Sequence, residues 1–543
     1  MVDTHPRKAD SGHAHPVRRL GALALAGLTA LSLAACSGGD SDREERDTLA
    51  SSIAHPAYLV GSELRTANAA SNLGVSTSAE VVSGRIYPGI YASGPAGQMI
   101  PNTDLATTQV LPGDKRTVIY TLTEQAKYAD GVPITCTDFL LSFKAGVLSD
   151  LFDSHLPLTR QVERLDCTPG AKKFSVTFRP GQGGRWRNLF GPGEVLPAHA
   201  IARKAGVSQQ QLTDALLADD RAALEPVATV WREGFNLDHF DPELQVSAGP
   251  YRIDEVGARG EVVLLSNQDY FGDPARIGAL TLWPAKTDGA WLASKADVIA
   301  ADLTDHGSAW LNRDDPANTY DITAVAGRLT DTLVLAPGGI FADEANRQAL
   351  AACIDHAAVA RISSEKSGIE VPAVGAHVVS YDDPAARHLA GVTDPHLDVD
   401  VNKARKLDQA TVRIGYQGPN ERYSAMVESI RQSCAPAGIT VVNAAGDNAG
   451  LGDLEGVTPY GSHSLDAVLM AVDPEQEYGQ VPAAGVNDDK GLYSAEEQLW
   501  NEVPDIPLSA QPRSFASHRK ISNITAYTGV TGLGWNLDRW QMS

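Results

Sequence analysis

A strand, a helix and a second strand follow one another in the second half of the chain, and this order constrains the fold most. The run "TVRIGY" at 411–416 has the composition of a buried strand. Residues 421–437 then repeat apolar side chains at intervals of three and four, as an amphipathic helix does, and "GITVV" at 438–442 is again strand-like. Because a helical crossover returns the chain in the same direction, the two strands are expected to lie parallel in an α/β lobe.

Other segments alternate between strand and helix in a similar way. Strands are predicted at 116–122, 172–178 and 466–472, a Gly-rich hairpin at 246–272, and helices at 137–148, 343–360 and within 204–245. Thr135 or Thr137 is expected to cap the first of these helices. In the segment 343–360, one helical stripe is formed by Leu350, Cys353, Ile354 and Ala357.

The N-terminus has the pattern of an export signal. Arg18 and Arg19 precede an uncharged apolar run of 16 residues, from Leu20 to Ala35. A membrane-spanning helix needs about 20 such residues, so the run predicts a signal peptide over residues 1–35. The general secretory route fits the flanking residues better than twin-arginine export.

The signal ends in "LAAC" at 33–36, which resembles the lipobox of bacterial lipoproteins. The resemblance implies cleavage before Cys36 and attachment of lipid to its thiol. Residues 36–50 are small, polar and charged, as expected of a tether between the lipid and a folded body at the outer face of the cytoplasmic membrane. The alternative is an ordinary secretory signal with a nearby cysteine.

Length and composition describe the rest of the chain as a globular body outside the bilayer. The 543 residues exceed what one hydrophobic core usually holds, so more than one domain is expected. The net charge of −22 disfavours nucleic acid or anionic lipid as a partner of the body, and a monomer is expected.

Four cysteines remain after Cys36, and an even number in an exported chain suggests two disulfides. Of three connectivities we favour the two pairs that each stay within one predicted lobe, Cys136 with Cys167 and Cys353 with Cys434. Four buried free thiols are the alternative.

Several phrases, in order along the chain, resemble the family 5 extracytoplasmic solute-binding proteins, the dipeptide- and oligopeptide-binding components of ABC importers. The phrases are "YTLTEQAKYADGVPITCTDFLLSF" at 120–143, the "GPY" hairpin with an asparagine-to-tyrosine stretch at 247–283, "RQALAACIDHAAVARI" at 347–362, "VNKARKL" at 401–407 and "LWNEVPDIPLSAQ" at 499–511. The resemblance implies an α/β, two-lobed periplasmic-binding-protein-like fold (type II) whose lobes close on a ligand, with an extra subdomain in lobe I. The implied segments are 51–90, 91–245 (extra subdomain), 246–310 and 501–543 for lobe I, and 311–500 for lobe II.

A nearer similarity lies in "WRNLFGPGEVLPAHAIA" at 186–202, which with "GPYRI" resembles the LpqW-type lipoproteins of actinobacteria. Two functions therefore stay open. One is delivery of a peptide or other polar solute to ABC permease subunits. The other is regulation of lipoglycan synthesis, with a phosphatidylinositol mannoside or related glycolipid as ligand and envelope glycosyltransferase machinery as partner.

Catalytic motifs are missing from the sequence, which contains neither G-x-S-x-G nor H-E-x-x-H and no phosphate-binding Gly-rich loop. His377, His388 and His396 have spacings that suit no compact metal site, and solvated loop histidines are expected there. We therefore predict a binding protein without enzymatic activity, cofactor or metal.

Four residues are candidate ligand contacts. Tyr416 and Asn420 follow a predicted strand at the start of a helix, where α/β sheets bind ligands, although Asn420 is equally explained as a helix cap and Tyr416 as packing. Asp473 in "LMAVDPEQEYG" corresponds to the aspartate with which peptide-binding relatives hold the peptide amino group, but the usual aromatic lead and paired acids are missing. Tyr91, with Tyr87 and Trp291, is an aromatic that could line the cleft or pack in the core.

Overall fold

The computed structural model describes residues 48–305, 308–478 and 489–543. The predicted signal peptide, Cys36 and most of the predicted tether lie outside these residues. Within them, every helix is too short or too polar to cross a bilayer.

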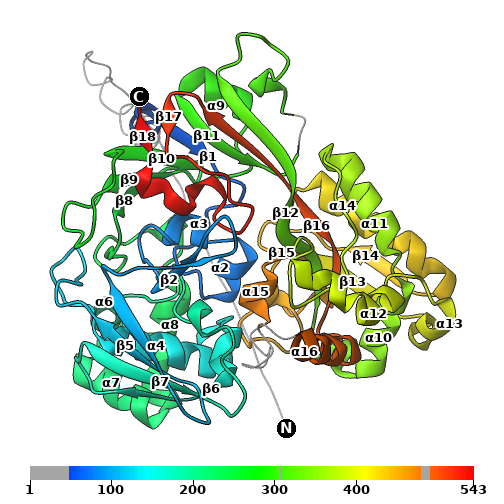
Figure 1. Ribbon diagram of the computed structural model, residues 1–543, viewed down its shortest axis with the longest axis horizontal. Helices are drawn as coiled ribbons and strands as arrows, with labels where there is room; N and C mark the ends of the chain where they lie inside the picture. Colours follow the sequence, from blue (N-terminus) through cyan, green and yellow to red (C-terminus); the bar gives the residue numbers. More distant parts are fainter. Residues whose placement is uncertain (1–47, 306–307, 479–488) are drawn as a thin grey trace, which may run out of the picture. The chain divides into compact units, whose positions relative to one another are not determined.

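A ten-stranded mixed sheet runs through the described part of the chain (Figure 1). Its spatial order is β14-β13-β15-β12-β16-β11-β1-β10-β9-β8. The strands are β1 (Ala57–Leu59), β8 (Tyr251–Val256), β9 (Val262–Ser266), β10 (Ala279–Trp283), β11 (Val298–Leu303), β12 (Tyr320–Leu335), β13 (Thr411–Gly415), β14 (Thr440–Asn443), β15 (Ala467–Val472) and β16 (Asp505–His518).

Each half of this sheet contains a group of parallel strands. β13 pairs in parallel with β14 and β15, and helix α14 (Glu421–Cys434) connects β13 to β14, which confirms the predicted strand–helix–strand unit. In the other half, β1 pairs in parallel with β10 and β11. We call the part built on β1 and β8–β11 lobe I, and the part built on β13–β15 lobe II.

Strands β12 and β16 belong to both lobes and pair with each other along their length (Figure 1). Their register shifts between Ala326 and Thr330, so the ladder is interrupted where one lobe passes into the other. Gly327 lies in this interruption. A Cβ atom there would be 2.7 Å from the Cγ of Arg513 and 2.9 Å from the carbonyl oxygen of Gln511, so the two strands approach too closely for a larger residue.

Lobe I also carries a separate four-stranded antiparallel sheet in the order β4-β5-β7-β6, with helices beside it (Figure 1). Its elements are β4 (Ala106–Leu111), β5 (Thr117–Leu122), β6 (Val162–Cys167), β7 (Lys173–Phe178), α4 (Cys136–Val147), α5 (Ser149–Phe152), α6 (Ala198–Lys204), α7 (Gln209–Ala218) and α8 (Arg221–Glu233). Of the two predicted caps, Thr135 is the N-cap of α4. It forms a capping box with Asp138, which explains why the helix begins there.

The α-helices of lobe II lie among and around its strands (Figure 1). They are α10 (Glu344–Cys353), α11 (His356–Ser367), α12 (Ala390–Thr393), α13 (Val401–Ala404), α14, α15 (Pro474–Glu477) and α16 (Asp489–Glu502). The prediction of one helical stripe over 343–360 was wrong. The chain leaves helical geometry at Ile354, Asp355 caps a new helix by accepting from the Ala358 N–H, and Ala357 is exposed.

Further short strands and α-helices are present. They are α2 (Asn72–Ser76), α3 (Glu80–Ser83), β2 (Tyr91–Ser93), β3 (Met99–Pro101), α9 (Gly289–Lys295), β17 (Ile521–Ser522) and β18 (Gln541–Met542). Two disulfides join Cys136 to Cys167 and Cys353 to Cys434, in agreement with the favoured pairing. The second ties α10 to α14 within lobe II.

Candidate ligand-binding cleft

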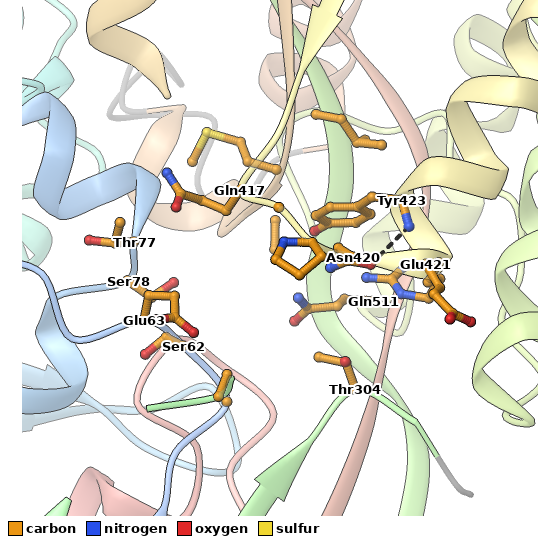
Figure 2. Close-up of a pocket in the computed structure, with 18 of the residues that line it drawn as sticks. Ser62, Glu63, Thr77, Ser78, Thr304, Gln417, Asn420, Glu421, Tyr423 and Gln511 are labelled. Carbon is orange, nitrogen blue, oxygen red and sulfur yellow. Dashed lines mark hydrogen bonds between the residues drawn. The ribbon is translucent and has the colours of Figure 1, made fainter. Parts of the chain in front are cut away.

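A cleft of about 860 Å³ lies between the two lobes (Figure 2). On the lobe I side it is lined by residues that follow the carboxyl ends of β1, β10 and β11. On the lobe II side it is lined by the loop from β13 to α14 and by part of β15, and Gln511 of β16 lies at the joint between the lobes. Ligands bind outside the carboxyl ends of parallel strands in α/β proteins, and here two such ends face one another.

The lobe I wall is hydroxyl-rich. Ser62 and Glu63 follow β1, Thr77 and Ser78 follow α2, and Thr304 follows β11 (Figure 2). The charge of Glu63 is already balanced, because one of its carboxylate oxygens lies 3.3 Å from the Lys286 ammonium and the other accepts the Lys286 backbone N–H at 2.9 Å.

The lobe II wall is formed by the turn that precedes α14. Asn420 is the N-cap of this helix, and its Oδ1 accepts the Tyr423 backbone N–H at 2.9 Å, shown by the dashed line in Figure 2. Gln417 donates from Nε2 to the Ala449 carbonyl oxygen at 2.7 Å. Glu421 in the first turn further offsets the positive end of the helix.

A buried ion pair forms part of the lobe II wall. The Arg422 guanidinium contacts the Asp331 carboxylate and donates to Ser363 Oγ at 3.0 Å, and Tyr423 donates its hydroxyl to Asp331 at 2.9 Å. Burial alone lowers the pKa of Arg422, but the charge of Asp331 outweighs it and the pKa is raised. Arg422 therefore stays charged, and its charge is directed to Asp331 inside lobe II.

A second set of contacts crosses between the lobes at helix α15. Arg185 donates from Nη1 to the carbonyl oxygens of Pro474 at 2.9 Å and Tyr478 at 2.8 Å, and from Nη2 to the carbonyl oxygen of Val378. Asn188 donates from Nδ2 to the Glu475 carbonyl oxygen at 2.7 Å. Burial lowers the pKa of Arg185, and the nearby acidic side chains of Glu475 and Asp473 offset part of this decrease.

Ion pairs reinforce this set. Arg328 of β12 lies 2.7 Å from the Glu475 carboxylate, and His155 lies 2.7 Å from that of Glu477. We call the contacts of His155, Arg185, Asn188 and Arg328 with α15 and its neighbours the interlobe latch. It holds the lobes together through groups of the chain itself.

Of the four candidate ligand contacts, the structure brings only Asn420 to the cleft. Tyr416 is 2% exposed in the lobe II core, where its hydroxyl accepts from Asn443 Nδ2 at 3.0 Å. Tyr91 is buried edge-on to Trp186 and its hydroxyl bonds to that of Thr108. Asp473 is the N-cap of α15 and accepts the Glu475 backbone N–H at 3.0 Å.

The expectation of solvated histidines was wrong for His377. Its side chain is fully buried, with Nδ1 2.7 Å from the Glu496 carboxylate, and its backbone N–H and that of Val378 also donate to Glu496. Burial lowers the pKa of His377, but the charge of Glu496 raises it above its ordinary value overall. His396 stacks on the ring of Trp500. Across the three described stretches, no cluster of three His, Cys, Asp or Glu side chains could hold a metal ion.

Sequence reasoning missed most polar residues of the cleft, among them Ser62, Gln417 and Gln511. Gln417 lies inside the predicted loop between Tyr416 and Asn420, so the loop was found but the contact residue was not. Ser62 and Gln511 carry no local signal, because only the pairing of β16 with distant strands brings Gln511 to the cleft.

Two lobes joined by a pair of shared strands, with a polar cleft between their facing strand ends, define a two-lobed solute-binding protein. The sequence agrees. Residues 101–458 match the family model of bacterial extracellular solute-binding proteins, family 5, and the chain belongs to this family.

Relatives and solved structures extend this result. The chain is 28% identical to an uncharacterized lipoprotein of Mycobacterium tuberculosis, over 99% of this chain and 100% of that protein, and 28% identical to one of Mycobacterium leprae, over 95% and 96%. The fold is similar to the periplasmic EDTA-binding protein EppA (TM-score 0.65, 18% identity, 90% of this chain and 96% of that one). It is also similar to the oligopeptide-binding protein AppA of Bacillus subtilis, solved with a nonapeptide (TM-score 0.64, 13% identity, 90% and 99%).

Proposed function

We propose that the chain is a lipid-anchored extracytoplasmic binding protein that holds a polar solute in the interlobe cleft and delivers it to ABC permease subunits. It performs no chemistry on that solute. The observation that carries the proposal is the cleft itself, which opens between facing strand ends and is lined by polar groups from both lobes.

The joint between the lobes supports a binding cycle. A cleft that must admit and enclose a solute needs lobes that move as bodies, and such hinges are formed by a few residues that change their backbone angles. The interruption of the β12–β16 ladder near Gly327 supplies a short segment of that kind.

Anchoring by lipid is supported by the relatives, which are named lipoproteins, and by the "LAAC" sequence that ends in Cys36. A binding protein held near the membrane surface is placed where permease subunits can receive its solute.

Native mass spectrometry tests the proposal. The mature protein is purified gently in detergent from membranes of its own source, and the mass of any bound solute is measured. The solute is then removed, and peptide pools are added to see whether binding returns. A Ser62→Trp variant, which fills the cleft, is expected to lose the solute, whereas Ser294→Trp on the exposed side of α9 is expected to keep it.

A released peptide or other small solute that returns on rebinding, with a rise in melting temperature, supports transport. A retained glycolipid, or a cleft that ignores peptides, would instead favour the regulatory role in lipoglycan synthesis, with glycosyltransferases as partners. Binding that survives Ser62→Trp would contradict both, because the solute would then lie outside the cleft.

A further inference from the structure

The inner part of the cleft differs from its rim in the kind of polar group it offers. Charged lining residues such as Lys286, Lys366, Glu421 and Asp447 are exposed. Less exposed amide and hydroxyl groups come from Ser62, Thr77, Gln417 and Gln511, beside the half-buried Glu63 and Arg65.

Three of these lining residues have buried polar atoms without a partner. The Oε1 atoms of Gln417 and Gln511 receive no hydrogen bond, and neither does the hydroxyl of Ser62. Gln511 is only 9% exposed. For Gln417 the orientation of the carboxamide is fixed, because its Nε2 already donates to the Ala449 carbonyl oxygen. A buried acceptor left unpaired costs about 1–3 kcal/mol, so a donor brought by a ligand would relieve this cost.

Of the four cations that line the cleft, two are paired with a carboxylate. Arg422 is paired with Asp331, Lys286 lies against Glu63, and Arg65 donates to Asn448 Oδ1 at 2.5 Å. The N-terminus of α14, which could otherwise attract an anion, is capped by Asn420 and followed by Glu421. Arg65 and Lys366 keep their charge, but five carboxylates line the cleft against four cations, so an anionic group would meet buried acceptors and an excess of negative charge.

We infer that the inner cleft binds an uncharged part of the ligand that is rich in hydrogen-bond donors, through Gln417 and Gln511, and discriminates against anions. Two kinds of ligand offer such a row of donors. A saccharide offers hydroxyl groups, and a peptide backbone offers amide N–H groups. This inference rests on the proposed function and names the class of its ligand.

The test uses two matched pairs of probes with the mature protein in detergent, measured by calorimetry. The saccharide pair is maltotriose and its anionic oxidation product maltotrionic acid. The peptide pair is trialanine capped by acetyl and methylamide groups, and the same acetylated peptide with a free carboxylate. Within at least one pair, the neutral probe is expected to bind ten-fold more tightly or better, and the pair that binds identifies the source of the donors.

Gln417→Leu and Gln511→Leu are expected to weaken the neutral probe about 5-fold to 10-fold each, since each removes one hydrogen bond to the ligand. Gln432→Leu is the matched control, because Gln432 lies on the same helix as Asn420 but is exposed and bonds to Glu428. Gln511→Leu is also expected to keep or raise the melting temperature of the empty protein, since it removes a buried acceptor without a partner.

The inference is overturned if either anionic probe binds as tightly as its neutral partner or more tightly. It is also overturned if both neutral probes fail to bind, or if the glutamine variants bind as the wild type does. Ser62→Trp separates this failure from that of the proposed function. Binding that Ser62→Trp abolishes but the glutamine variants leave unchanged refutes the donor-rich ligand and keeps the cleft. Binding that Ser62→Trp leaves unchanged refutes the cleft itself.

Discussion

Arg185 donates a hydrogen bond to the backbone carbonyl oxygen of Tyr478, with 2.8 Å between Nη1 and the oxygen, across the boundary between the lobes. The same guanidinium serves the carbonyl oxygens of Pro474 and Val378. Val378 and Tyr478 are themselves positioned from within lobe II, because Glu496 accepts the Val378 N–H and the Tyr478 hydroxyl donates to Asp505. One side chain of lobe I thus binds backbone that lobe II holds in place.

Replacing Arg185 by alanine is expected to open the lobes. The change leaves three carbonyl oxygens without their donor, and we expect a loss of about 2–4 kcal/mol from the closed arrangement. Small-angle scattering should show a larger radius of gyration for Arg185→Ala. Arg187→Ala is the control, since Arg187 is exposed two residues away and lies over the Trp186 ring. Equal radii for wild type and Arg185→Ala would show that the interlobe latch does not hold the lobes.

Replacing Arg422 by methionine is expected to destabilise the protein strongly. The Asp331 carboxylate would stay buried without its cation, which costs about 3–5 kcal/mol. Adding Asp331→Asn to this variant should recover part of the loss, because it removes the unpaired charge. Denaturant unfolding measures both effects. If the single and double variants unfold alike, the stability does not depend on the pairing of these charges.

Glu80→Gln is expected to stabilise the protein at pH 8 and to have little effect near pH 4.5. Burial, with the nearby charges of Glu194 and Asp473, raises the pKa of Glu80 to about 8. A carboxyl whose pKa is raised on folding holds its proton in the folded state, so stability falls as pH rises from about 4.5 towards 8. Glutamine resembles the protonated form and removes this fall. Melting curves of both proteins between pH 4.5 and 8.5 measure the effect, and parallel curves would contradict it.

Cys36→Ala is expected to release the protein from the membrane. A thioether-linked lipid requires the thiol, and the described residues offer no membrane-spanning helix in its place. Fractionation of cells should move the variant from the membrane pellet to the soluble or secreted fraction. Cys353→Ala is an informative comparison, because that cysteine lies in a disulfide of lobe II and its loss should leave fractionation unchanged. A Cys36 variant that stays in the pellet although its N-terminal mass shows that residues 1–35 were removed would rule out the lipid anchor.

Local patterns predicted most of the individual elements. The stripe in α14 and the alternation in β7 depend on neighbouring residues only, so they can be read without the rest of the chain. The break after Cys353 was missed because apolar spacing continues through Ile354, whereas the helix ends when Asp355 caps the next one. Capping chemistry, not periodicity, decides that boundary.

The cleft was much less predictable. Gln417 lies in a segment that sequence patterns did point to, but Gln511 reaches the cleft only because β16 pairs with both β11 and β12. Conversely, Tyr416 was a candidate because of its place after a strand, yet its ring faces the core. Position along a strand locates the end of a sheet, and the direction of each side chain depends on pairings between distant segments.

The interrupted pairing of β12 and β16 has a mechanical consequence. The loss of pairing is confined to the few residues between Ala326 and Thr330, and a hinge confined to so few residues turns the lobes about a narrow axis. Opening and closing should therefore follow one path, in which the same wall residues meet on every cycle. A solute is then selected by a single closed geometry rather than by many partly closed ones.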